Sequence, residues 1–79
     1  NDPTYWAEKA SLHLRVNQFI DAIKSAERCT QLAPEYSDGF IVLGIAQIQN
    51  KDKANGLKSL QKAKELGDTR ANELINKYK

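Results

Sequence analysis

Apolar residues recur every three or four positions in the middle of the first half of the chain, where the helical pattern is clearest. This stripe consists of Phe19, Ala22, Ile23, Ala26, Cys29 and Leu32. Such spacing gathers apolar side chains on one face of an α-helix. Pro34 must end the helix near Ala33, because proline lacks an N–H and disfavours helical geometry in the residue before it. A polar turn follows, and the same apolar spacing resumes at Phe40.

The same spacing, with its start and stop signals, predicts five helices in all. They are expected at about residues 4–15, 19–33, 38–49, 54–66 and 69–78. Expected N-caps are Asp2 for the first helix, Ser37 or Asp38 for the third, and Asp68 or Thr69 for the fifth. Pro3 suits the first helical position, and Gly67 can adopt the left-handed conformation that ends the fourth helix.

The chain also matches itself when it is displaced by 34 residues. Trp6 then aligns with Phe40, Ala10 with Gly44, Ile23 with Leu57, Ala26 with Leu60, Cys29 with Ala63 and Leu32 with Leu66. A 34-residue period of helix pairs, with the pattern W-x2-L-G-x2-Y, A-x3-F and P, is typical of tetratricopeptide repeats. The first copy has Trp6, Lys9, Ala10, His13, Ala22, Ala26 and Pro34; the second has Phe40, Leu43, Gly44, Gln47, Gly56, Leu60 and Asp68. The chain therefore resembles this family over nearly its whole length.

The resemblance implies an all-α fold of antiparallel helix-turn-helix repeats, stacked as a short right-handed α-solenoid. We expect a single domain spanning residues 1–79, with repeats at 3–36 and 37–70 and a capping helix at about 69–78. Leu74, Ile75 and Tyr78 form a narrow apolar face on that last helix, which suits the terminal element of a stack. Two repeats are fewer than the three usually needed for stability, so a second copy of the chain is one way to extend the stack.

Composition narrows the function little. The net charge of +2 indicates no polyanionic partner by itself, although residues 51–79 carry eight basic and four acidic side chains. No apolar run reaches 18 residues, so membrane insertion is not expected. Because the chain begins at Asn1 and not at Met, we expect a segment or a mature form of a longer protein, and no compartment is predicted.

Two residues invite a catalytic interpretation. His13 and Cys29 are the only histidine and cysteine, and such a pair could form a thiolate nucleophile. They occupy repeat positions where the family has a packing tyrosine and a packing alanine, and no third group to orient the histidine is evident. One histidine and one cysteine are too few soft ligands for zinc. The sequence therefore predicts no enzyme, no cofactor and no metal site, and a buried Cys29.

A run of lysines in the second half raises the alternative of nucleic-acid binding. It consists of Lys51, Lys53, Lys58, Lys62 and Lys64. These residues do not share one helix face, and no aromatic side chain is interleaved with them as a stacking platform. A solvated helix face is the simpler interpretation, and nucleic acid is not the favoured partner.

The family resemblance implies a partner-binding groove lined by the first helix of each repeat. The matching positions are Thr4, Ala7, Glu8, Ser11 and Arg15 in the first repeat, and Asp38, Ile41, Val42, Ile45 and Gln49 in the second. The third helix is apolar almost all round, so its second face is covered either by other helices or by a ligand. Chaperone-binding members carry basic and Asn residues at groove positions to clamp a C-terminal carboxylate. This chain has Ala7, Ser11, Ile41 and Val42 there, with Arg15 as the only cation, so that clamp is not expected.

The sequence thus predicts a non-catalytic module that binds a peptide or helix of another protein. Affinity is expected from Ile41, Val42 and Ile45, and specificity from Arg15, Glu8, Asp38 and Gln49. Self-association is the alternative within the same class, and nucleic-acid contact through the basic second half is the alternative from another class.

Lys9 bears on which end of a stack this is. The family has Leu at its position, where the side chain packs against a preceding repeat. Because an unpaired lysine is costly to bury, we expect its ammonium in solvent and its stem along Trp6 or His13. On that interpretation no further repeat stacks before Asn1, and Tyr5 and Trp6 favour pairing with another copy.

Overall fold

Five α-helices follow one another in the computed structural model, which describes residues 2–79. They are α1 (Pro3–Arg15), α2 (Phe19–Leu32), α3 (Ser37–Gln49), α4 (Lys53–Glu65) and α5 (Thr69–Tyr78). Each bound lies within one residue of the sequence expectation, and no strand occurs among the described residues. The all-α fold, a short stack of helix pairs, is therefore confirmed. The first residue of the expected domain, Asn1, lies outside the described part.

Two of the expected helix caps are present. The Asp2 carboxylate accepts a hydrogen bond from the Thr4 backbone N–H (2.9 Å), and Pro3 occupies the first helical position of α1. Asp68 caps α5 in the same way, with its carboxylate accepting from the Arg70 backbone N–H (3.0 Å). These bonds satisfy backbone donors that the first turn of a helix leaves without an intrahelical acceptor.

The expected cap of α3 was wrong. Tyr36 is the N-cap residue, and neither Ser37 nor Asp38 bonds the first turn of α3. Both side chains point instead toward the start of α5, where the Ser37 hydroxyl donates to Asp68 and the Asp38 carboxylate accepts from Arg70. Ser37 and Asp38 thus bond residues at the start of α5 and do not cap α3.

The turns inside the two helix pairs have the same backbone geometry. Asn17 and Lys51, which are 34 positions apart, both adopt positive φ (60° and 66°). The next residue donates its backbone N–H to a carbonyl five residues back in each turn, Gln18 to His13 and Asp52 to Gln47, both at 2.8 Å. The 34-residue period seen in the sequence is therefore also a period of the backbone. Gly67 has positive φ (94°) after α4, as expected.

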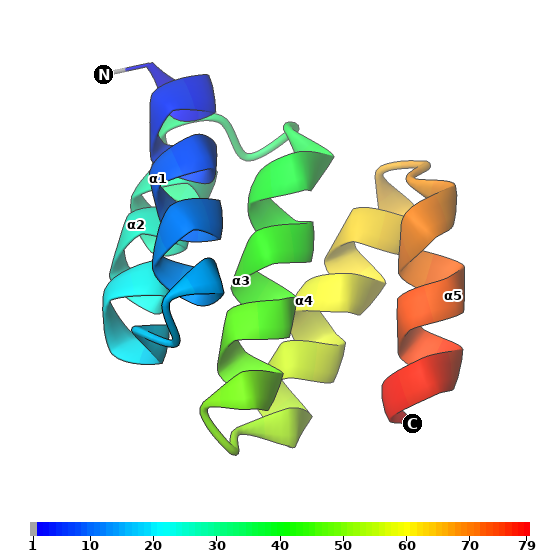
Figure 1. Cartoon of the computed structure of the whole chain (residues 1–79). Helices are drawn as coiled ribbons and strands as arrows, with labels where there is room; N and C mark the ends of the chain where they lie inside the picture. Colours follow the sequence, from blue (N-terminus) through cyan, green and yellow to red (C-terminus); the bar gives the residue numbers. More distant parts are fainter. Residues whose placement is uncertain (1) are drawn as a thin grey trace.

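Helix α3 is the centre of the molecule, because it contacts each of the other four helices. In Figure 1 it lies between α1 and α5, with α2 and α4 packed behind this row. This position explains why α3 is apolar almost all round: its second face is covered largely by the chain itself. Helices α3 and α4 are in close contact at Gly44, where a Cβ would lie only 2.9 Å from the backbone oxygen of Gly56.

The core is built from small side chains on both helix pairs. The fully buried hydrophobic residues are Ala10, Ala22, Ala26, Cys29, Ala46, Leu60, Ala63 and Ala71. Small residues allow helices to approach closely, which suits a two-layer stack. Helix α5 joins this core through Ala71, with Leu74, Ile75 and Tyr78 packed around the cluster that contains Leu60 and Ala63.

Candidate functional site

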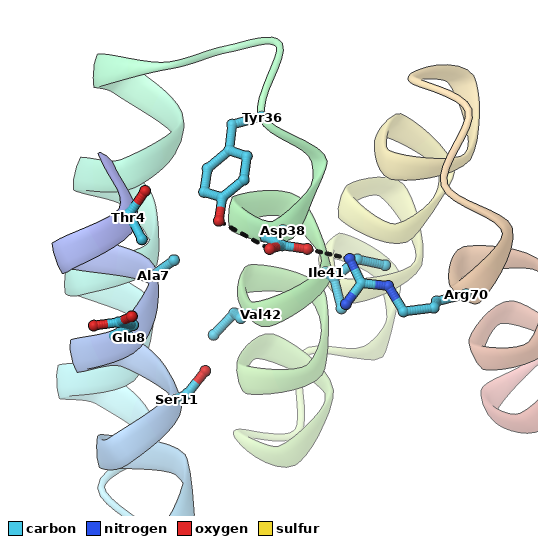
Figure 2. A pocket seen from close by; sticks show the side chains of 9 residues that line it. All are labelled: Thr4, Ala7, Glu8, Ser11, Tyr36, Asp38, Ile41, Val42 and Arg70. Carbon is cyan, nitrogen blue, oxygen red and sulfur yellow. Dashed lines mark hydrogen bonds and ion pairs between the residues drawn. The ribbon is translucent and has the colours of Figure 1, made fainter. Parts of the chain in front are cut away.

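A hollow of about 230 Å³ opens between α1, α3 and the first turn of α5. Nine residues line it, and we call this hollow the groove: Thr4, Ala7, Glu8, Ser11, Tyr36, Asp38, Ile41, Val42 and Arg70. Figure 2 shows these side chains facing the space between the three helices. The α1 residues are three or four positions apart, so they form one helix face, and Ile41 and Val42 stand opposite them on α3.

A hydrogen-bonded cluster of charged and polar groups closes one end of the groove. The Tyr36 hydroxyl donates to Asp38 (2.9 Å), and the Arg70 guanidinium forms an ion pair with the same carboxylate (Figure 2). Arg70 also pairs with Asp68 (2.6 Å), which in turn accepts from the Ser37 hydroxyl (2.9 Å). The cluster thus joins the start of α3 to the start of α5.

The pKa values of this cluster follow from those bonds. The Arg70 guanidinium beside Asp68 lowers the pKa of that carboxyl to about 2, so Asp68 is ionised throughout the physiological range. Tyr36 donates its hydroxyl proton to the Asp38 carboxylate, and this bond raises the pKa of the Tyr36 phenol. Its two carboxylate partners raise the pKa of Arg70. Tyr36, Asp68 and Arg70 are therefore held in their ordinary charge states, as in a structural and not a proton-transferring cluster.

The structure brings together seven of the ten positions that the resemblance assigned to the groove. They are Thr4, Ala7, Glu8, Ser11, Asp38, Ile41 and Val42. Arg15 lines an adjoining hollow of about 300 Å³ with Glu8, Ser11 and Leu12, so it lies farther along the same face of α1. Ile45 and Gln49 line neither hollow.

The two isoleucines predicted to supply affinity are less available than their sequence positions indicated. Ile41 is only 6% exposed and belongs to the core cluster with Leu60 and Ala71. Ile45 is half-buried and packs against the same cluster. Because other side chains already cover Ile41, a ligand that contacts it would remove little further apolar surface from water. Half-buried Val42 is the apolar α3 residue that the groove leaves more accessible.

Sequence reasoning missed Tyr36 and Arg70. Both lie just outside the helix positions that the resemblance assigned to the groove, but they are 34 residues apart, so they occupy equivalent places in the period. The first turn of α5 corresponds to the first turn of another first helix. Extending the period past residue 70 would have placed Arg70 beside the groove.

His13 and Cys29 do not form a catalytic arrangement. Cys29 is fully buried, as predicted, and its thiol lies against α3, where a Cβ on Gly39 would be 2.8 Å from the sulfur. Burial, together with the charge of Asp38, raises the pKa of the Cys29 thiol, which is the opposite of what a nucleophilic thiolate requires. His13 instead lies within hydrogen-bond distance of Gln18, with 2.9 Å between its Nδ1 and the amide oxygen.

Within residues 2–79 no three His, Cys, Asp or Glu side chains gather as metal ligands would. None of the helices in the described part of the chain has the length and apolar character needed to cross a membrane. The five lysines of the second half, Lys51, Lys53, Lys58, Lys62 and Lys64, are all exposed, as expected for a solvated surface.

Comparisons with known proteins give two similarities. The chain is 31% identical over 67 residues to an E3 ubiquitin-protein ligase CHIP of Arabidopsis thaliana, which covers 85% of this chain and 24% of that protein. It is 27% identical over 78 residues to an Hsp70-Hsp90 organizing protein 2 of the same plant, which covers 99% of this chain and 14% of that protein. No protein-family model matches the chain. The chain thus spans about a quarter or less of either relative, and with the stack of helix pairs these similarities support a tetratricopeptide-like domain.

Proposed function

We propose that this chain is a tetratricopeptide repeat domain with repeats at residues 3–36 and 37–70 and a capping helix at about 69–78. The recurrence of the Asn17 and Lys51 turns at the 34-residue period supports this division. Helix α5 supports the capping role, because its Ala71 is buried in the core while Asn72 and Glu73 are exposed. A polar outer face of this kind keeps the end of a stack soluble.

We further propose that the domain is a non-catalytic module that binds a peptide or helix of a partner protein in the groove. The observation that carries this proposal is the groove itself, which α1, α3 and α5 line together with both apolar and polar side chains. Ala7 and Val42 supply apolar walls. Thr4, Glu8 and Ser11 offer hydrogen-bonding groups along one edge. This combination of apolar contact and a few polar contacts is typical of peptide recognition.

The groove does not favour recognition of a partner's C-terminal carboxylate. Among the described residues that line it, Arg70 is the one cation, and it is already paired with Asp38 and Asp68. The name of one relative includes Hsp70 and Hsp90, so these two chaperones are suitable first protein probes. If either binds, we expect removal of its last residue to change the affinity little. A strong dependence on that carboxylate would contradict this account of the groove.

Blocking the groove tests its role directly. Ser11 is half-buried and lines both the groove and the adjoining hollow, so Ser11→Trp places a large ring where both meet. Peptides selected from a displayed library on the wild-type domain should lose about tenfold or more in affinity for this variant. Gln61→Trp, at an exposed position of α4, is the matched control and should bind as the wild type does.

The result requires a stability measurement beside it. Ser11→Trp should keep the melting temperature within a few degrees, because the ring enters open space and not the core. Selected peptides that bind Ser11→Trp as tightly as the wild type would overturn the groove proposal. Ile45→Glu is a poorer test, since Ile45 packs against the core cluster and the variant would also lose stability.

Self-association is a second candidate function, and a specific observation favours it. Among the described residues, four large hydrophobic side chains are more than half exposed, and all belong to the first helix pair: Tyr5, Leu12, Val16 and Ile20. Leu12 lies in the last turn of α1, Val16 is the C-cap of that helix, and Ile20 follows in the first turn of α2. A second copy that covered these side chains would remove them from water.

A further inference from the structure

A second hollow, of about 500 Å³, lies over α1 and α2. We call it the basic hollow. Its α1 side is formed by Trp6, Lys9 and His13, and its α2 side by Asp21, Lys24, Ser25 and Arg28. None of these residues lines the groove, because the α1 members are offset from the Thr4, Ala7 and Ser11 face. The two hollows are therefore separate sites on different faces of α1.

The charges in the basic hollow are unbalanced. Lys9, Lys24 and Arg28 bring three cations, whereas Asp21 is the one carboxylate in the lining. Within residues 2–79 the ion pairs are those of Arg70, so none of these three cations lies within pairing distance of a carboxylate. Like charges that converge around one hollow repel one another, and an anion placed between them relieves that repulsion.

Lys9 is held in place by aromatic rings. Its ammonium lies 5.0 Å from the centre of the Trp6 ring and 5.9 Å from that of Tyr5. Such cation–π contacts position the charge without neutralising it. The sequence predicted a Lys9 ammonium in solvent with its stem along Trp6 or His13. In the structure the residue is half-buried, and the ammonium itself packs on the Trp6 ring.

One uncharged donor of the lining also lacks an acceptor. The indole N–H of Trp6 is buried within the chain and has no hydrogen-bond acceptor among the described residues. Indole, ammonium and guanidinium groups can only donate hydrogen bonds. A ligand suited to this lining therefore supplies several acceptor oxygens and a negative charge.

We propose that the basic hollow binds an oxyanion carried by a partner protein, either the carboxylates of an acidic peptide segment or a phosphorylated side chain. Arg28 and Lys24 approach it from α2, and Lys9 from α1. Arg28 suits such a group because its guanidinium can donate two parallel hydrogen bonds to carboxylate or phosphate oxygens. This site does not depend on the groove, so the proposal stands apart from the proposed function.

The tryptophan provides a built-in reporter. Trp6 is the only tryptophan in the chain and lines the basic hollow, so its fluorescence reports occupancy. Three peptides of one sequence would be titrated, with a central pair of residues that is glutamate, phosphoserine or serine. The glutamate or the phosphoserine peptide should bind, and added salt should weaken the binding, whereas the serine peptide should not bind. Comparing the first two identifies which oxyanion is preferred.

Charge removal then locates the site. The double variant Lys24→Gln and Arg28→Gln should weaken binding by about tenfold or more, because it removes two of the three cations of the basic hollow. Both residues are exposed. The control is Lys58→Gln with Lys62→Gln on α4, which removes the same charge elsewhere and should change affinity less than about twofold. Ser11→Trp should leave this binding unchanged, because Ser11 does not line the basic hollow.

Several outcomes would overturn the proposal. Equal binding of the serine peptide would show that no oxyanion is recognised. Equal losses in the α2 double variant and the α4 control would show a general effect of net charge. Binding of a single-stranded oligonucleotide in clear preference to both anionic peptides would assign the surface to nucleic acid and not to a protein segment.

Discussion

At the scale of single residues, Cys29 illustrates how tightly the two helix pairs meet. Its side chain is fully buried and lies against Gly39 of α3, so the space for a larger group is small. Small substitutions at such a position are tolerated better than large ones, because added atoms force neighbouring backbone to move.

We therefore expect Cys29→Ala to be mild and Cys29→Leu to cost about 1–3 kcal/mol of unfolding free energy through overpacking. Chemical denaturation of the three proteins measures both effects. In the folded wild type, a polar thiol reagent should react slowly, because the thiol is buried and its pKa is raised. Rapid labelling under native conditions would contradict the buried position.

Gly44 is a second position with no space for a larger side chain, because it lies in the contact between α3 and α4. A Cβ there would lie 2.7 Å from a side-chain carbon of Leu60 and 2.9 Å from the backbone oxygen of Gly56. In an open helix, alanine is more favourable than glycine by about 1 kcal/mol. Here the contact between α3 and α4 should reverse that preference.

We expect Gly44→Ala to destabilise the domain by about 1–3 kcal/mol, since fully buried Leu60 and the α4 backbone must shift. Thermal unfolding followed by circular dichroism measures the change. Lys58→Ala, at an exposed position of α4, is the control and should stay within about 0.5 kcal/mol. A Gly44→Ala variant that is more stable than the wild type would show that α3 and α4 are not in close contact.

At the scale of elements, hydrogen bonds and ion pairs hold the start of α5 against the start of α3. Asp68 caps α5, accepts from Ser37 and pairs with Arg70, which also reaches Asp38. One carboxylate thus serves local helix geometry and tertiary contact together. The Asp68 side chain is 8% exposed, whereas Arg70 is 57% exposed, so solvent screens part of the attraction.

The ionised Asp68 carboxylate in these contacts predicts that the stability of the domain depends on pH. The pKa of Asp68 is lowered from 3.8 to about 2 on folding, so its contribution is present above about pH 4 and lost as pH falls through about 2. Asp68→Asn keeps a capping side chain but removes the charge. It should cost about 1–2 kcal/mol near neutral pH, and most of that difference should disappear near pH 2. Urea unfolding of both proteins at each pH measures it, and a difference that does not change with pH would contradict the assignment.

At the scale of the whole molecule, the exposed large apolar side chains of the described residues all belong to the first helix pair. Leu12, Val16 and Ile20 are the aliphatic ones, whereas the large apolar side chains of α3 and α4 are buried or half-buried. Burying such a side chain fully is worth about 1.5–3 kcal/mol. This asymmetry is the physical basis of the self-association candidate.

If copies pair through this surface, sedimentation should show a dimer at high concentration that dissociates on dilution. The triple variant Leu12→Ser, Val16→Ser and Ile20→Ser should be monomeric at the same concentrations. Ala54→Ser, at an exposed position of α4, is the control and should leave the dimer unchanged. A wild-type domain that remains monomeric at millimolar concentration would remove this candidate.

The helices themselves were largely predictable from the sequence. Apolar spacing, Pro3, Pro34 and Gly67 act over a few residues, so their effects on the backbone can be inferred from neighbouring positions. The 34-residue period was likewise visible as aligned pairs such as Ala26 and Leu60. Seven groove residues followed from the resemblance because helix faces repeat at fixed spacing.

Tertiary structure decided which of those faces remain accessible. The sequence by itself determined that α3 is apolar almost all round, but only its place among four neighbouring helices showed that Ile41 is already buried. Ser37 and Asp38 have the chemistry of helix caps, yet their side chains bond Asp68 and Arg70 at the start of α5, about thirty residues farther along the chain. The convergence of Lys9, Lys24 and Arg28 on one hollow likewise depends on how α1 packs against α2. Local pattern determines what each helix is, whereas burial and pairing depend on contacts between residues that are distant in the chain.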